Sequence, residues 1–158
     1  MRSNFAKLLK YLRRSFPTAE LETVRKAYRV ANDAHTGQVR QSGEPYVIHC
    51  LKVGQILAKL GLDPVTCAAG VLHDVIEDNP DYSRKRVADL FGEEIAALVD
   101  GVTKIGGLSL VGEPVELEVK QAQNIRKMLV ATAKDVRVIL IKLADRLHNM
   151  RTIEFLEQ

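Results

Sequence analysis

The residues most able to do chemistry lie in the segment 71–78, which reads Val-Leu-His-Asp-Val-Ile-Glu-Asp. Residues four apart on a helix share a face, so Glu77 would lie beside His73, and Asp78 beside Asp74 in the same way. Burying such groups without partners is costly. A divalent metal ion would neutralise the carboxylates and take an imidazole as a further ligand. As alternatives, a lone His-Asp pair also occurs by chance, and the acidic pair could simply end a helix.

Two distant residues extend this set. His49 begins another apolar helical segment, and Asp145 lies in the strongly apolar sequence LIKLADRLHN. A carboxylate in such surroundings needs a partner, which a metal ion would supply. Imidazole and carboxylate ligands together suit Mn, Fe or Zn better than a thiolate site or an oxygen-only Mg or Ca site does. Alternatively, His49 could cap a helix, and Asp145 could pair with Lys142 or Arg146.

The loop 40–46, which leads directly into His49, is a second group of interest. Arg40 can stack on a base or grip a phosphate, Ser42 can donate a hydrogen bond, and Tyr46 offers a ring and a hydroxyl. A ligand held by this loop would therefore lie beside a metal bound at His49. An ordinary surface turn is the alternative.

The composition is that of one soluble globular domain. The chain has 158 residues, 46% hydrophobic and 27% charged, which is enough to bury a substantial core and too apolar for a disordered chain. The net charge of +3 suits a phosphorylated small molecule but is too small to indicate a nucleic-acid surface. Cys50 and Cys67 are too few for a disulfide framework and are expected to be reduced. No apolar stretch approaches the ~18 residues of a membrane span, and the N-terminus lacks a signal-peptide pattern, so a cytoplasmic location is predicted.

Apolar residues recur at helical spacing along most of the chain. Caps are predicted at Thr18, Asp63 and Ser83, and helix ends at Gly61 and Gly92. The predicted helices span residues 5–12, 18–35, 49–60, 64–76, 83–90, 93–103, 116–133 and 136–147, with loops at 36–46 and 106–114.

The segment 136–147 is ambiguous because β-branched residues are frequent in it, which favours a strand. Leu140, Leu143 and Leu147 nevertheless share one helical face, and nothing else in the chain offers a strand partner, so a buried helix is predicted. The prediction is an all-α single domain covering residues 1–158. Because the pattern continues to Gln158 without a stop signal, we expect a fragment of a longer protein.

Four segments, in order, resemble the N-terminal hydrolase domain of RelA/SpoT-type alarmone enzymes. They read AHTGQVRQSGEPYVIH, AAGVLHDVIED, FGEEIAALVDGVTKI and QNIRKMLVATAKDVRVILIKLADRLHNMRT, and they cover nearly everything from Ala27 to Thr152. The resemblance implies an all-α HD phosphohydrolase that removes pyrophosphate from the 3′ position of ppGpp and pppGpp with Mn²⁺. It also implies synthetase and regulatory domains further along the parent protein. No contact of this domain with membranes or nucleic acid is expected.

The resemblance also implies roles for particular residues, with Glu77 and Asp78 activating water or relaying protons. The implied metal ligands are His49, His73, Asp74 and Asp145. The implied nucleotide contacts are Arg40, Gln41, Ser42, Tyr46, Asn149 and Thr152. Gln41 departs from the family, which usually has Lys or Arg there, and the stretch 106–120 matches less closely. His35 is interpreted as structural or as supporting the ligands from behind, and His148 as a helix residue with no assigned role.

Two other functions stay open at this point. The chain could be an HD phosphohydrolase for another nucleotide, or a regulatory module that binds the alarmone with weak or no turnover. Because Glu77 and Asp78 are both present, an active enzyme is favoured over the module.

Overall fold

The computed structural model describes residues 2–106, 130 and 134–152, and this part of the chain is helical. Its only β-type pairing is an isolated bridge between Val39 and Pro45. The predicted all-α fold is therefore confirmed. The helices are α1 (Arg2–Ser15), α2 (Glu22–Ala34), α3 (Tyr46–Lys59), α4 (Pro64–Val71), α5 (Val75–Asp78), α6 (Arg84–Phe91), α7 (Glu93–Gly106) and α9 (Val136–Met150).

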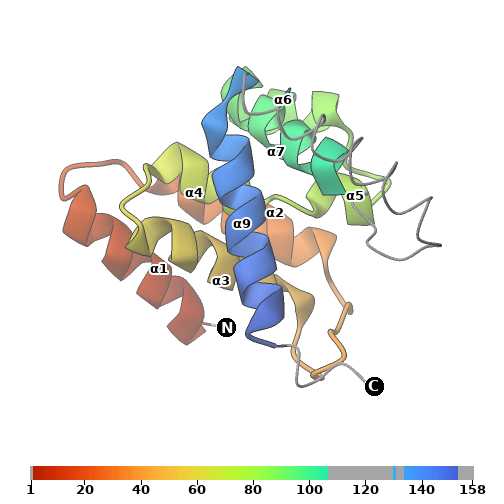
Figure 1. The fold of residues 1–158 in the computed structure, drawn as a ribbon, viewed down its shortest axis with the longest axis horizontal. Helices are drawn as coiled ribbons and strands as arrows, with labels where there is room; N and C mark the ends of the chain where they lie inside the picture. Colours follow the sequence, from red (N-terminus) through yellow and green to blue (C-terminus); the bar gives the residue numbers. More distant parts are fainter. Residues whose placement is uncertain (1, 107–129, 131–133, 153–158) are drawn as a thin grey trace, which may run out of the picture.

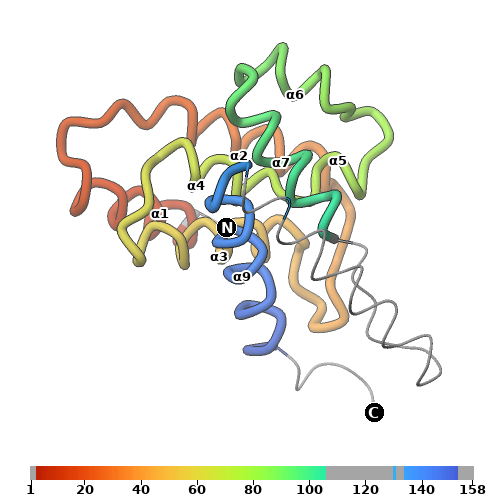
Figure 2. The backbone as a smooth tube through the Cα atoms, turned by 45° about the horizontal axis from the view of Figure 1, so that its top comes forward, coloured from red at the N-terminus to blue at the C-terminus, as the bar shows by residue number. Residues whose placement is uncertain are grey.

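Helix α3 lies at the centre of the domain and packs against α1, α4 and α9. Figure 1 shows α9 running across α3 and α4, and Figures 1 and 2 both place α1 and the α6–α7 pair on opposite sides of these central helices. Fully buried leucines from several helices fill the space between them, among them Leu8, Leu51 and Leu72. None of the helices in the described ranges combines the length and the apolar character needed to cross a membrane.

Local sequence signals set several helix boundaries as predicted. The Asp63 side chain accepts hydrogen bonds from the backbone N–H groups of Val65 and Thr66, so it caps α4. The Ser83 hydroxyl accepts one from the N–H of Arg86 and caps α6. After α3 and after α6 the backbone enters the left-handed region, with φ of +79° at Gly61 and +87° at Gly92, where glycine is favoured.

Several helices are a few residues longer than predicted, and two predictions differ from the structure in a way that has a physical cause. Thr18 is not the cap of α2, because the chain makes another turn first and α2 begins at Glu22, with Leu21 buried at the capping position. The predicted helix 64–76 is broken, since α4 ends at Val71 and α5 starts only at Val75. The predicted loop 106–114 and helix 116–133 lie almost entirely outside the described residues.

The ambiguous segment 136–147 is helical, and α9 runs on to Met150. The Asp135 carboxylate accepts a hydrogen bond from the Arg137 N–H and caps its start. Val138 and Ile141 are buried against the core. Tertiary packing thus outweighs the strand preference of the β-branched residues.

Helices α3 and α4 cross closely because glycine stands at the contact on each. A Cβ on Gly54 would lie 2.8 Å from Val71 Cγ2, and a Cβ on Gly70 would overlap Leu57 Cδ1. Leu57 is fully buried, so it has little space to move away. This close approach brings the start of α3 and the end of α4 together, where the predicted metal ligands lie.

We expect Gly70→Ala to destabilise the protein although alanine is the better helix former. The overlap with Leu57 should cost about 1–3 kcal/mol, more than the gain of about 1 kcal/mol in helix propensity. In a Leu57→Val background, where the overlapping atom is gone, the same change should be neutral or stabilising. Urea unfolding of the four proteins measures both effects. A more stable Gly70→Ala single variant would contradict this packing.

Candidate functional site

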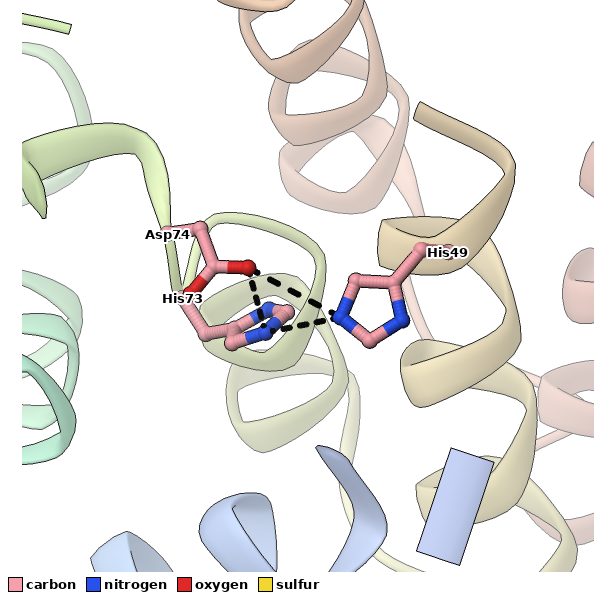
Figure 3. Close-up of side chains that lie close together, drawn as sticks. All are labelled: His49, His73 and Asp74. Atoms are coloured by element: carbon pink, nitrogen blue, oxygen red, sulfur yellow. Dashed lines mark hydrogen bonds and ion pairs between the residues drawn. The ribbon is translucent and has the colours of Figure 1, made fainter. Parts of the chain in front are cut away.

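Two histidines and two aspartates meet where α3, the α4–α5 junction and α9 come together. His49 lies in the first turn of α3, His73 and Asp74 lie between α4 and α5, and Asp145 lies on α9. Both histidines and Asp145 are buried, and Asp74 is mostly so. Figure 3 shows His49, His73 and Asp74 directed toward one another. The structure thus brings together the four residues predicted as metal ligands.

The distances within this group, here called the His-Asp cluster, suit a shared cation. His49 Nε2 lies 3.3 Å from His73 Nε2 and 3.7 Å from Asp74 Oδ2, while His73 Nε2 lies 2.9 Å from Asp74 Oδ2 (Figure 3). Asp145 Oδ1 lies 3.3 Å from His49 Nε2 and 3.8 Å from His73 Nε2. Ligand atoms at about 2.0–2.2 Å from one ion are separated by about 3–4.4 Å, depending on the angle between them. His49, His73 and Asp74 therefore lie close enough together to hold one divalent ion, and Asp145 lies beside both histidines, within reach of the same space.

The break between α4 and α5 makes this arrangement possible. In a continuous helix, His73 and Asp74 would point about 100° apart around the axis. Instead the chain turns at 72–74, with the Val75 N–H donating to the Leu72 carbonyl at 3.0 Å. The two side chains can then face the same space. The predicted helix is therefore interrupted before Val75, while the Asp78 N–H still donates to the Asp74 carbonyl at 2.8 Å, so these two residues lie one helical turn apart as predicted.

His73 is held from behind by the backbone. Its Nδ1 donates to the Gly70 carbonyl oxygen at 2.9 Å, which directs Nε2 toward the carboxylates. Such a hydrogen bond on the rear nitrogen is the usual way in which a histidine ligand is oriented.

The cluster also perturbs its own ionisation. Burial alone would lower the pKa of His73, but the carboxylates of Asp74 and Asp145 outweigh it and raise that pKa to about 10. Burial would raise the pKa of Asp74, but His73 and His49 hold it at about 2, and the histidines hold the Asp145 pKa well below its usual range. Burial lowers the pKa of His49. At neutral pH, His73 is therefore an imidazolium between two carboxylates.

Two further residues belong to the site, namely His148, which was given no role, and Lys142, which was considered only as an alternative partner of Asp145. His148 Nδ1 lies 2.8 Å from His49 Nδ1, and burial, with His49 and Arg40 nearby, lowers the His148 pKa to about 4. Lys142 Nζ lies 3.0 Å from Asp145 Oδ2, so the pairing considered as an alternative to a metal coexists with the cluster. Both residues lie three positions from Asp145 on α9, and this spacing, which places side chains on one helical face, could have indicated them from the sequence.

The acidic pair predicted for proton transfer lies at the outer edge of the cluster. Glu77 and Asp78 are exposed on α5, and Asp78 Oδ2 is 4.0 Å from Nδ1 of the buried His35. Partial burial and the nearby charge of Asp74 raise the pKa of both carboxyl groups. A raised carboxyl pKa suits a group that exchanges protons near neutral pH.

The predicted nucleotide residues divide into two sets. The first set contacts the cluster or its neighbours, since the Tyr46 hydroxyl donates to Asp74 Oδ2 at 2.8 Å and Arg40 Nη2 donates to Asn149 Oδ1 at 2.6 Å. The second set does not. Gln41 is exposed, Ser42 is half-buried, and the Thr152 hydroxyl donates to the backbone at the end of α9.

A helical domain with a buried His-Asp cluster at a helix junction defines a class of metal-binding domain. The chain belongs to the HD domain family, whose sequence model matches residues 27–158. It is 49% identical over 134 residues to the guanosine-3′,5′-bis(diphosphate) 3′-pyrophosphohydrolase of Vibrio cholerae, covering 85% of this chain and 18% of that protein. It is 47% identical over 142 residues to a GTP pyrophosphokinase of Myxococcus xanthus, covering 90% of this chain and 18% of that protein.

The chain is also similar in fold to a solved structure. A metazoan ortholog of SpoT, described as hydrolysing ppGpp, superposes with a TM-score of 0.65 at 32% identity, covering 87% of this chain and 73% of that one. The resemblance to RelA/SpoT-type hydrolase domains is confirmed. The chain spans about a fifth of the length of the curated relatives it matches.

Metal binding at the cluster should release a proton and weaken as the pH falls. The pKa of His73 is about 10, so at pH 7 an ion must displace the proton from its Nε2. Apparent affinity for Mn²⁺ should then fall about tenfold for each pH unit between pH 8 and pH 6. Calorimetry in buffers of different ionisation enthalpy measures the proton release directly. Binding without proton release would show that His73 is not a ligand.

Proposed function

We propose that this chain is the hydrolase domain of a RelA/SpoT-type enzyme and removes pyrophosphate from the 3′ position of ppGpp and pppGpp. The observation that carries the proposal is the His-Asp cluster, in which side chains 96 positions apart in the chain, His49 and Asp145, place their ligand atoms 3.3 Å apart. The names of the relatives and of the solved structure supply the substrate.

The cofactor proposed is Mn²⁺, bound by His49, His73, Asp74 and Asp145. A mixed set of imidazoles and carboxylates suits this ion, and Tyr46 and Asn149 support the two aspartates by hydrogen bonds of 2.8 Å each. When bound, the ion supplies Lewis-acid stabilisation of phosphate charge and lowers the pKa of water.

The proton transfers are assigned to Glu77 and Asp78. Water adds to the 3′-linked phosphorus, the bond from that phosphorus to the ribose 3′ oxygen breaks, and GDP or GTP and pyrophosphate are the products. One carboxylate takes the proton from water, and the ribose oxygen receives a proton in return. The raised pKa of both carboxyl groups supports this assignment.

The nucleotide is proposed to lie along the loop 40–46 and the end of α9. Arg40 and Tyr46 each contact a side chain at the edge of the cluster, so a nucleotide held by the loop would reach the cluster with its 3′ phosphates. Gln41, Ser42 and Thr152 complete the proposed contacts. The same proposal includes a cytoplasmic location, the range 1–158 as one domain, and synthetase and regulatory domains elsewhere in a longer protein.

Incubation of the purified chain with ppGpp tests this function. We expect GDP and pyrophosphate with Mn²⁺, no products with a chelator, and no products from the His73→Ala/Asp74→Ala double variant. The matched control is Asp89→Ala/Lys85→Ala on exposed positions of α6, which should retain full turnover. Manganese-dependent turnover by the cluster variant would contradict the assignment, and tight ppGpp binding without products would indicate a regulatory module. Products from a different nucleotide alone would indicate another HD phosphohydrolase.

Glu77→Gln and Asp78→Asn should separate chemistry from metal binding. Because neither carboxylate is proposed as a ligand, Mn²⁺ affinity should stay within a few fold of the unmodified chain. Loss of proton transfer should lower kcat by about 10²–10⁴-fold in at least one variant. Steady-state kinetics with parallel metal titrations measure both quantities. Unchanged kcat in both variants would remove the acidic pair from the mechanism.

A further inference from the structure

Arg40 connects the loop to the His-Asp cluster by two separate routes. Its Nη1 lies 3.3 Å from His148 Nδ1, and its Nη2 donates to Asn149 Oδ1 at 2.6 Å. His148 in turn lies 2.8 Å from Nδ1 of His49, and Asn149 Nδ2 donates to Asp145 Oδ1 at 2.8 Å. Each arm of one guanidinium is thus a single residue away from one proposed ligand.

The chemistry of arginine fixes the direction of every hydrogen bond in these two routes. A guanidinium has donors only, so the Nδ1 of His148 and the Oδ1 of Asn149 must both accept. The single lone pair of His148 Nδ1 is then shared between Arg40 at 3.3 Å and His49 at 2.8 Å, so the Nδ1 of His49 must carry the hydrogen. The lone pair of His49 is then on Nε2, which is the atom that faces the other three cluster residues.

The hydrogen bonds of the second route are oriented in the same way. Because the amide oxygen of Asn149 faces Arg40, its amide nitrogen must face Asp145. Asp145 is thereby held by Asn149 on one oxygen and by Lys142 on the other. The side chain of Asp145 is buried, so these two bonds fix where its carboxylate points.

We propose that Arg40 is a positioning residue for the metal centre, in addition to any contact that it makes with the nucleotide. It orients His49 through His148 and Asp145 through Asn149, so the loop must be in place for the cluster to bind its ion tightly. The inference rests on the proposed function only in taking the cluster as a site for a divalent cation. It couples the nucleotide loop to the metal through named side chains.

The direction in which metal affinity changes when Arg40 is replaced distinguishes this positioning role from a purely electrostatic effect. A positive charge near a cation site repels the cation, so removing Arg40 would raise metal affinity if charge alone mattered. Loss of the two hydrogen-bonded routes predicts the opposite, since substitution of a residue that orients a ligand costs about 10–100-fold in metal affinity. Arg146, which is exposed on α9 next to Asp145, offers the same charge change without these contacts.

The experiment is a calorimetric Mn²⁺ titration of the purified chain without nucleotide. We expect Arg40→Met and Arg40→Lys to bind Mn²⁺ about 10–100-fold more weakly, and Arg146→Met to bind as the unmodified chain does or slightly more tightly. His148→Leu should lose affinity to a similar extent. His148→Asn, which keeps an acceptor oxygen near the Nδ1 position, should recover most of it. Circular dichroism melts of each variant identify any that do not fold.

Unchanged or increased affinity in Arg40→Met overturns the proposal. If Arg40→Met does not fold, the His148 pair decides, and equal affinities of His148→Leu and His148→Asn overturn it. The proposed function fails in a different way. If the unmodified chain binds no Mn²⁺, both the proposed function and the positioning role of Arg40 are overturned. If the chain hydrolyses ppGpp with Mn²⁺ but Arg40→Met still binds Mn²⁺ tightly, only the positioning role is overturned.

Discussion

Two imidazoles and two carboxylates share a buried space, and burying them is unfavourable unless neighbouring groups compensate their charges. Isolated charges in such surroundings are strongly disfavoured. Mutual contact reduces the cost, because His73 is charged between two aspartates and Lys142 approaches Asp145 from the other side. A dipositive ion in place of the proton would neutralise the same carboxylates. The neighbouring structure serves the same geometry, since the glycines at the α3–α4 crossing and the break after Val71 bring His49, His73 and Asp74 together.

The loop 40–46 and the end of α9 join this centre to the surface. Tyr46 donates to Asp74, and Arg40 reaches His148 and Asn149, so the residues assigned to the nucleotide also touch those that hold the cluster. A hydrolase of a nucleotide pyrophosphate needs this proximity, because the phosphates must reach the ion while the base is held by the loop. Glu77 and Asp78, exposed on the short helix α5, are placed where water and protons can enter. The fold thus keeps the proposed ligands largely buried and leaves the proposed acid-base pair exposed.

Local chemistry made much of this fold predictable from the sequence. Asp63 and Ser83 cap helices, and Gly61 and Gly92 end them, because each acts on its own neighbours. The cap predicted at Thr18 was wrong because α2 begins only after Leu21, whose burial is set by tertiary packing. The break at 72–74 was hidden, since apolar residues continue through Val75 and Ile76. For the site, His73 and Asp74 stood out locally and Asp145 stood out as a carboxylate in an apolar segment. The family resemblance then implied all four residues, His49 included, as ligands. His148 was missed because its partner lies 99 positions away.

The central prediction is that the His-Asp cluster holds one divalent ion. A crystal structure of the chain grown with Mn²⁺, with anomalous diffraction recorded near the manganese absorption edge, tests it most directly. We expect a single strong anomalous peak at about 2.0–2.3 Å from His49 Nε2, His73 Nε2 and one oxygen each of Asp74 and Asp145. A peak held elsewhere, or the cluster unchanged with no peak at saturating Mn²⁺, would contradict it.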